Sequence, residues 1–179
     1  ILRCLVGSEM CIRDRSKTTI GKQQIGSYGL YFGRVTEEKG VETVIKAYEK
    51  LPEYTVKIMG DDTTDEAKRL KKYVENHKMK NVEFLGFKSG AELENVIKGA
   101  RFTLIPSIWY DNLPNTALES FQYSKPVIAS NIGSLPELVI DGENGYLFKP
   151  SNVEDLIKKI KMLDDDTLVK NCLLYTSPS

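Results

Sequence analysis

The sequence predicts an α/β fold, a doubly wound parallel sheet of six strands with helices on both faces. Short β-prone apolar runs alternate with segments in which apolar residues recur at helical spacing. This alternation is typical of parallel strands, because two neighbouring parallel strands need a long crossover that is usually a helix. With 179 residues, the chain is long enough for one domain with a substantial core.

Six runs are expected to be strands, and they are Tyr28–Phe32, Tyr54–Met59, Val82–Leu85, Phe102–Ile105, Pro126–Ala129 and Tyr146–Phe148. Apolar residues at helical spacing predict helices over 41–51, 67–77, 93–100 and 153–163. A further helix is expected to begin near Pro114 and to contain Glu119. In a doubly wound order of 3-2-1-4-5-6, the first and fourth strands are neighbours and the chain reverses direction between them. Ligands of such sheets bind at this switch point, outside the carboxyl ends of the strands.

The two ends of the chain are interpreted as foreign to this fold. One DNA string that encodes residues 172–179 has a reverse complement that, in a shifted frame, encodes Ser8–Asp14. Unrelated natural segments rarely have this relation, so we interpret 1–15 and 172–179 as translated sequencing adapter, to be set aside. The expected domain is 16–171, and the clipped ends imply a longer natural chain.

Composition without these ends excludes several classes of protein. All three cysteines lie in them, so neither a disulfide nor a cysteine metal site is expected. Removing three arginines and two acids from 25 basic and 25 acidic residues leaves a net charge near −1. A near-neutral chain gives no reason to expect nucleic acid as a partner.

Segment 106–120 carries the most informative polar pattern. It leaves a buried strand, passes through a polar and aromatic loop, and enters a helix for which Pro114 suits the first turn. The free N–H groups of a helix N-terminus attract anions. Two carboxylates, Asp111 and Glu119, flank these groups. A nucleotide sugar needs both kinds of group, because its phosphates are anionic and its hydroxyls bind carboxylates.

A second loop, after the first predicted strand, supplies positive charge. Arg34 and Lys39 lie between Gly33 and Gly40; arginine can grip phosphate oxygens with two hydrogen bonds, and lysine adds a compact charge. Two basic residues in a loop are usually only solvated. Here the predicted strand order brings the loop to the crevice that segment 106–120 borders, which favours a binding role.

Two common nucleotide-binding patterns are absent. The chain has neither Gly-x-Gly-x-x-Gly after its first strand nor Gly-x-x-x-x-Gly-Lys-Ser/Thr. Binding of a dinucleotide cofactor and phosphate-loop NTPase activity are therefore not expected.

Six short motifs, in order, resemble a known family. They are Gly33-Arg34 with Lys39-Gly40, Phe84-Leu85-Gly86, Pro106-Ser107, Asp111-x7-Glu119-Ser120, Pro126–Ser130, and Pro136–Val139 with Asp141–Gly145. Their order and spacing over residues 26–163 look like the C-terminal donor-binding domain of family-four retaining glycosyltransferases (glycosyl transferases group 1). The resemblance implies GT-B architecture, in which the active site lies between two Rossmann-like domains.

The resemblance also implies roles for the matching residues. Arg34 and Lys39 would bind the diphosphate leaving group, Asp111 would contact the transferred sugar, and Glu119 would bind the ribose hydroxyls. Other expected donor contacts are Gly33, Gly60, Phe87, Asn112, Leu113, Pro114, Asn115 and Thr116. The family usually has Glu where this chain has Asp111, which is one methylene shorter and bears on the identity of the donor sugar.

The implied partners are a nucleotide-sugar donor, an acceptor (a glycan, a lipid-linked molecule or a small molecule) and the missing N-terminal acceptor domain. No cofactor and no metal are expected, since the family works without a metal and the sequence offers no obvious metal cluster. No apolar run approaches the ~20 residues that span a membrane. We expect a cytoplasmic location, and attachment to the inner face of the membrane through the missing domain stays open.

We therefore expect a glycosyltransferase fragment that binds a nucleotide-diphosphate sugar and that, in the full-length enzyme, transfers the sugar with retention in glycan or glycolipid synthesis. Two alternatives stay open, a non-catalytic nucleotide-sugar-binding module and a flavodoxin-like signalling domain with Asp61 and Asp62 at a strand end. Trp109 and Tyr110 could flank a sugar or nucleoside, or serve packing or a domain interface.

Overall fold

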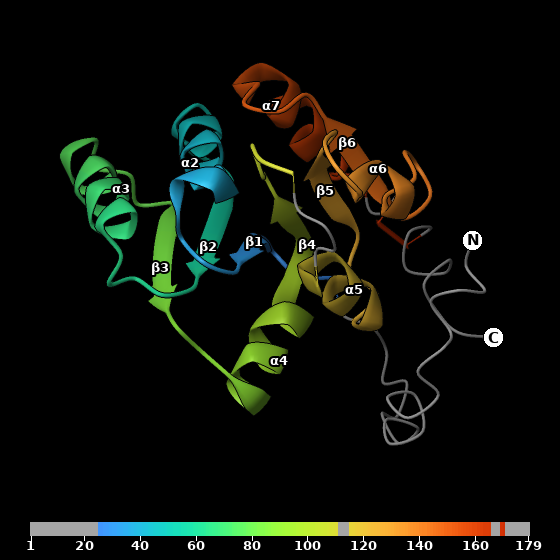
Figure 1. The fold of residues 1–179 in the computed structure, drawn as a ribbon, viewed down its shortest axis with the longest axis horizontal. Coiled ribbons are helices and arrows are strands. Elements are labelled where there is room, and N and C mark those ends of the chain that lie inside the picture. Colours follow the sequence, from blue (N-terminus) through green and yellow to red (C-terminus); the bar gives the residue numbers. More distant parts are fainter. Residues whose placement is uncertain (1–24, 111–114, 166–168, 171–179) are drawn as a thin grey trace.

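The structure is a computed structural model that describes residues 25–110, 115–165 and 169–170, and Figure 1 shows its fold. Its strands are β1 (Tyr28–Phe32), β2 (Thr55–Met59), β3 (Val82–Gly86), β4 (Ala100–Ile105), β5 (Val127–Ser130) and β6 (Gly145–Phe148). They form one sheet in the order β3-β2-β1-β4-β5-β6, and every neighbouring pair is parallel. The doubly wound, Rossmann-like fold expected from the sequence is confirmed.

The helices between the strands are α2 (Val41–Glu49), α3 (Asp65–Asn76), α4 (Gly90–Gly99), α5 (Asn115–Gln122), α6 (Leu135–Leu138) and α7 (Val153–Met162), with a 3-10 turn η1 (Glu37–Lys39) before α2. Most boundaries differ from expectation by one to three residues, and one residue changes from helix to strand. Ala100, expected at the end of a helix, is the first residue of β4, because Gly99 ends α4 and the backbone of Ala100 is extended. The interpretation of 1–15 and 172–179 concerns residues outside the described part.

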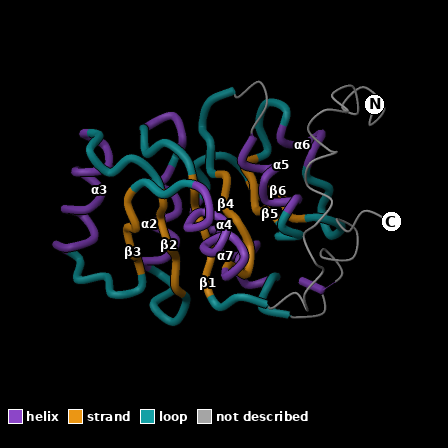
Figure 2. Tube along the Cα trace, turned by 90° about the horizontal axis from the view of Figure 1, so that it is seen from below, coloured by secondary structure: helices purple, strands orange, loops and turns teal. Residues whose placement is uncertain are grey.

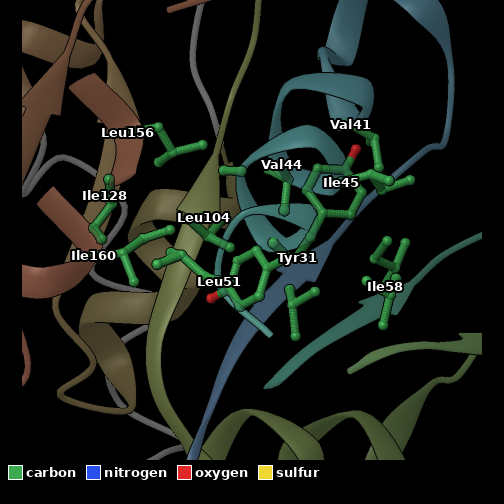
Figure 3. Packing of buried hydrophobic residues seen from close by; sticks show 14 of the residues in the cluster. Tyr31, Val41, Val44, Ile45, Leu51, Ile58, Leu104, Ile128, Leu156 and Ile160 are labelled. Atoms are coloured by element: carbon green, nitrogen blue, oxygen red, sulfur yellow. The ribbon is translucent and has the colours of Figure 1, made fainter. Parts of the chain in front are cut away.

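Helices cover both faces of the sheet (Figure 1). The largest buried cluster lies between the sheet and α2, α3 and α7, and Figure 3 shows its packing around residues such as Tyr31, Ile45, Leu104, Ile128 and Leu156. On the other face, smaller clusters pack the strands against α4, and against α5 and α6. Burying one such aliphatic side chain contributes about 1.5–3 kcal/mol, so both faces hold the sheet in place.

One half-buried amide organises the turn from α2 into β2. The Asn81 side chain donates hydrogen bonds to the backbone carbonyls of Tyr48, Leu51 and Tyr54 at 2.8, 3.0 and 3.0 Å. The carbonyls of Tyr48 and Leu51 also accept from the backbone N–H groups of Leu51 and Tyr54 at 3.2 and 3.1 Å. Asn81 therefore adds a side-chain donor to the turns between α2 and β2, from its position just before β3.

The strand order places the ends of β1 and β4 side by side near the middle of the sheet. Tyr31 of β1 is in register with Leu104 of β4, and both strands lie in the middle of the row in Figure 2. The chain leaves β1 toward β2 and leaves β4 toward β5, so the loops after β1 and β4 separate in opposite directions. This is the switch point where doubly wound sheets bind ligands.

Candidate functional site

The loops after β1 and β4 meet, as the sequence predicted. The backbone N–H of Ile108 donates to the carbonyl of Glu38 at 3.0 Å. Gly40 has a left-handed backbone (φ +65°), and a Cβ placed on it would lie only 2.1 Å from the carbonyl oxygen of Pro106. Glycine thus permits a close approach of two backbones that a side chain would prevent. The contact holds the two loops in one fixed relation.

A cleft of about 230 Å³ opens between these loops at the carboxyl ends of β1 and β4. We call it the donor cleft, and its lining residues are Tyr31, Phe32, Gly33, Arg34, Lys39, Leu104, Ile105, Ser107, Asn115 and Thr116. Apolar strand ends form its floor, and cations and polar groups form its walls. Ligand sites commonly have this division, in which a few placed polar groups orient the ligand.

Arg34 and Lys39 are the two cations of the donor cleft. Arg34 is exposed and Lys39, the last residue of η1, is half-buried. Within the described part of the chain, the guanidinium of Arg34 has no hydrogen bond or ion pair, while its backbone carbonyl accepts from the Tyr31 hydroxyl at 2.5 Å. The backbone of Arg34 is therefore anchored while its charged group stays available to a ligand.

The first turn of α5 also lines the donor cleft. Asn115 and Thr116 line it, and the first backbone N–H groups of any α-helix lack partners within the helix. A buried chain of hydrogen bonds fixes this turn to the sheet. The hydroxyl of Thr103 in β4 donates to Ser120 Oγ at 2.8 Å, and Ser120 donates to the carbonyl of Thr116 at 2.6 Å. Two cations and the first turn of a helix thus line one cleft, an arrangement that suits a phosphate.

A second, larger hollow of about 420 Å³ adjoins the donor cleft. We call it the outer hollow, and it is lined by Arg34, Glu38, Lys39, Trp109 and Tyr110. The pKa of Glu38 lies below its ordinary value, chiefly because its own backbone N–H bonds the carboxylate, and also because Arg34 and Lys39 are near. Its carboxylate is therefore charged at neutral pH and accepts hydrogen bonds.

Three predicted contact residues hold different positions around the cleft. Gly33 lines it, with its backbone N–H bonded to the carbonyl of Met59 at 3.0 Å. Gly60 lies behind Gly33, where a Cβ would come within 1.9 Å of the Gly33 carbonyl oxygen. Phe87 is 76% exposed just after β3. Gly60 and Phe87 belong to neither hollow's described lining, so their contact with a nucleoside stays a prediction.

The predicted carboxylates are placed only in part. Glu119 is half-buried on α5, one turn beyond the residues that line the donor cleft. Asp111, Asn112, Leu113 and Pro114 lie outside the described residues. The predicted first acid and most of the predicted helix-capping segment therefore stay expectations from the sequence.

Several lining residues were not among the predicted site residues: Tyr31, Phe32, Leu104, Ile105 and Ser107 in the donor cleft, and Glu38, Trp109 and Tyr110 in the outer hollow. Ser107 was noticed only as part of a motif, although its position directly after Pro106 at a strand end could have indicated the cleft. The other cleft residues were expected only as parts of strands, and Glu38 was expected only as part of a loop. Only the folded arrangement of the two loops brings them into the two hollows.

Among the described residues, no group of three or more His, Cys, Asp or Glu side chains is placed to hold a metal ion. The same part of the chain contains no helix that is both long and apolar enough to cross a membrane.

Fold and site together define a class, the doubly wound α/β domains with a cleft lined by cations at the switch point of the sheet. The sequence comparison then gives the family. Residues 13–173 match the family described as glycosyl transferases group 1, and the chain belongs to this family.

Two relatives illustrate the match in sequence. An uncharacterised glycosyltransferase of Methanocaldococcus jannaschii is 32% identical over 145 residues, which are 80% of this chain and 40% of the relative. A glycogen synthase of Mycobacterium tuberculosis is 32% identical over 146 residues, 76% of this chain and 34% of that protein. The chain thus spans two fifths or less of the length of these relatives.

Solved structures agree with the fold. HepE from Anabaena, in complex with UDP and glucose, matches with a TM-score of 0.75 and 24% identity, over 86% of this chain and 44% of HepE. The C-terminal domain of LpcC, a group 1 glycosyl transferase from Francisella tularensis, matches with a TM-score of 0.74 and 25% identity, over 88% of this chain and 90% of that one.

The flavodoxin-like alternative is wrong. A flavodoxin-like sheet has the strand order 2-1-3-4-5, whereas this sheet has the order β3-β2-β1-β4-β5-β6. Asp61 and Asp62 instead interact with other side chains and backbone groups of this chain. Asp61 accepts hydrogen bonds from the backbone and hydroxyl of Thr63, and Asp62 forms an ion pair with Lys71 at 2.6 Å.

Proposed function

We propose that this chain binds a nucleotide-diphosphate sugar in the donor cleft, and that the full-length enzyme transfers the sugar to an acceptor with retention and without a metal. The observation that carries the proposal is that Arg34, Lys39 and the first turn of α5 line one cleft. A diphosphate carries several charges, and both the cations and the helix N-terminus attract anions.

The relatives support the same ligand class. HepE was solved with UDP and glucose, and the relatives from Methanocaldococcus jannaschii and Mycobacterium tuberculosis are named as a glycosyltransferase and a glycogen synthase. Retention and metal independence rest on the motif resemblance, and the proposal extends to the reaction class of the whole protein.

In the proposed reaction, the bond between the anomeric carbon and the phosphate oxygen breaks. The diphosphate keeps the electron pair, the acceptor oxygen bonds the anomeric carbon, and the acceptor proton passes to the departing phosphate. Negative charge therefore builds up between Arg34 and Lys39. Fixed cations that bind the departing diphosphate more strongly than the ester lower the barrier. Near a protein surface, two unit charges 4 Å apart attract by about 4 kcal/mol, so two such cations matter to the rate.

The carboxylates complete the proposed donor site. Glu119, half-buried behind the cleft, would accept hydrogen bonds from the ribose hydroxyls, and Asp111 would accept them from the transferred sugar. Asn115 and Thr116 would contact the phosphates through the backbone N–H groups of the first helical turn.

Calorimetric titration of the 179-residue chain with UDP, GDP, ADP and NAD tests donor binding. We expect saturable binding of one nucleoside diphosphate. Losing one charge-assisted hydrogen bond costs about 1.5–3 kcal/mol, so Arg34→Ala should weaken binding about tenfold or more. Glu119→Ala should also weaken it, through the ribose. Lys72→Ala is a matched control because Lys72 is an exposed lysine on α3, and it should leave the affinity unchanged.

The result that would contradict the proposal is the absence of binding by any diphosphate, or an affinity that neither Arg34→Ala nor Glu119→Ala changes. Preference for NAD would indicate a dinucleotide-binding protein instead. A non-catalytic binding module stays the second possibility, since the chain covers 40% of its relative in Methanocaldococcus jannaschii. Sugar transfer by the full-length protein, lost in Lys39→Ala, would exclude it.

A further inference from the structure

We propose that the outer hollow binds a sugar ring of the acceptor, so that a carbohydrate is the acceptor class of this enzyme. The inference rests on the proposed function, because an acceptor site must adjoin a donor bound in the neighbouring cleft. It assigns a binding role to Trp109, Tyr110 and Glu38.

The two aromatic side chains are exposed to solvent, although large aromatic side chains are usually buried. Trp109 is 70% exposed and Tyr110 is 74% exposed, although burying a large aromatic or aliphatic side chain contributes about 1.5–3 kcal/mol. They follow Ile108, whose backbone N–H is bonded to the Glu38 carbonyl at 3.0 Å. The same contact that joins the two loops therefore holds the aromatic pair beside the charged residues.

The chemistry of the hollow fits a pyranose. A sugar ring has apolar C–H faces, which stack on aromatic rings, and a rim of hydroxyls that both donate and accept hydrogen bonds. Trp109 and Tyr110 offer the apolar surfaces. Glu38 offers an ionised acceptor for hydroxyls, and Arg34 and Lys39 offer donors. A lipid tail would find charges of both signs in this hollow, and an anionic headgroup would meet the carboxylate of Glu38.

The position of the hollow fits the stereochemistry. With retention, the acceptor oxygen bonds the anomeric carbon on the face that the phosphate leaves. The acceptor must therefore lie beside the groups that hold the departing diphosphate. Arg34 and Lys39 line both hollows, so a ligand in the outer hollow adjoins the same two cations as the diphosphate in the donor cleft.

Trp109 is the only tryptophan in the chain, so its fluorescence reports directly on the outer hollow. We would titrate the UDP-saturated chain with maltotriose, cellotriose, chitotriose and mannotriose, following Trp109 emission and heat. The expected result is saturable binding of at least one trisaccharide with a blue shift of the emission, because a stacked ring shields the indole from water.

Variants separate this site from the donor site. Tyr110→Ala should weaken the trisaccharide about tenfold and leave UDP affinity unchanged, and Tyr110→Phe should retain the sugar. Glu119→Ala should weaken UDP, whereas its trisaccharide affinity at saturating UDP should stay unchanged. Ile140→Ala is the control, since Ile140 is an exposed apolar residue after α6, and it should change neither ligand.

Two results would overturn the inference. One is UDP binding without binding of any trisaccharide, and the other is binding to phosphatidylglycerol vesicles that Tyr110→Ala abolishes while no sugar binds. The second would identify the hollow as a membrane contact. If UDP fails to bind, GDP or ADP takes its place in the titration, and failure of all three refutes the proposed function itself, so the two failures are distinguishable.

Discussion

The close approach of Gly40 to Pro106 gives a sharp test of how the site is built. A Cβ on Gly40 would lie 2.1 Å from the Pro106 carbonyl oxygen, whereas real contacts of this kind stay beyond 3.0 Å. In Gly40→Ala, the loop after β1 must therefore move about 0.9 Å away from the loop after β4. That movement strains the hydrogen bond between Ile108 and Glu38 and widens both hollows.

Gly90 provides a matched control. Its backbone is also left-handed, at φ +57° compared with +65° for Gly40, but a Cβ placed on it meets nothing within 4 Å. Both alanine variants incur the cost of a left-handed alanine, about 1–2 kcal/mol. Only Gly40→Ala adds overpacking, about 1–3 kcal/mol. The difference between the two variants isolates the contact between the loops.

Urea unfolding followed by circular dichroism would measure the free energy of unfolding of both variants, and calorimetry would measure UDP affinity. We expect Gly40→Ala to be about 1–3 kcal/mol less stable than Gly90→Ala and to bind UDP more weakly. Equal stability together with equal UDP affinity would refute the reasoning, because the loops would then tolerate separation without consequence.

Three further predictions concern stability. Burial lowers the pKa of Lys125 from 10.5 to about 8, so the unfolded chain holds this proton more tightly and the wild type should gain stability between pH 8 and 10. Lys125→Met should abolish that gain and raise the free energy of unfolding by about 1–2 kcal/mol at pH 7; a Met variant with the wild-type pH profile would contradict this. Asn81→Ala should lower the free energy of unfolding by about 1–2 kcal/mol, because three carbonyls lose the Asn81 donor while those of Tyr48 and Leu51 keep a backbone donor. Asn81→Asp, which replaces the donor by an acceptor, should be no better. Tyr48 Oη is buried and, among the described residues, has no hydrogen-bond partner, so Tyr48→Phe should raise the free energy of unfolding by about 1 kcal/mol in the same urea experiment; a loss of stability would reveal a hidden partner.

Much of the fold could be read from the sequence because its signals are local. The apolar run Leu30–Phe32 ends at Gly33, and the spacing of Val41, Val44 and Tyr48 has the period of a helix. Six strands alternating with helices then leave few topologies, since crossovers between parallel strands keep one hand. The observed strand order is the one expected.

The site was predictable to the extent that it follows from this order. Arg34 and Lys39 come after β1, and Asn115 and Thr116 come after β4. Because β1 and β4 are adjacent strands, these four residues line one cleft. The positions of individual residues within that region could not be predicted from the strand order. No local pattern indicated that Gly60 lies against the Gly33 carbonyl, and its expected contact with a nucleoside stays a prediction.

The sequence by itself determined the α/β class, the strand order and the two loops that form the cleft, because each rests on periodicity or motif spacing within a short stretch of chain. Only the tertiary structure decided that Gly40 lies against Pro106 and that Glu38 shares a hollow with Trp109 and Tyr110. These contacts join segments far apart in the chain, and their geometry depends on how helices on both faces fix the strand ends. No local pattern encodes such distances, which is why the outer hollow emerged from the fold.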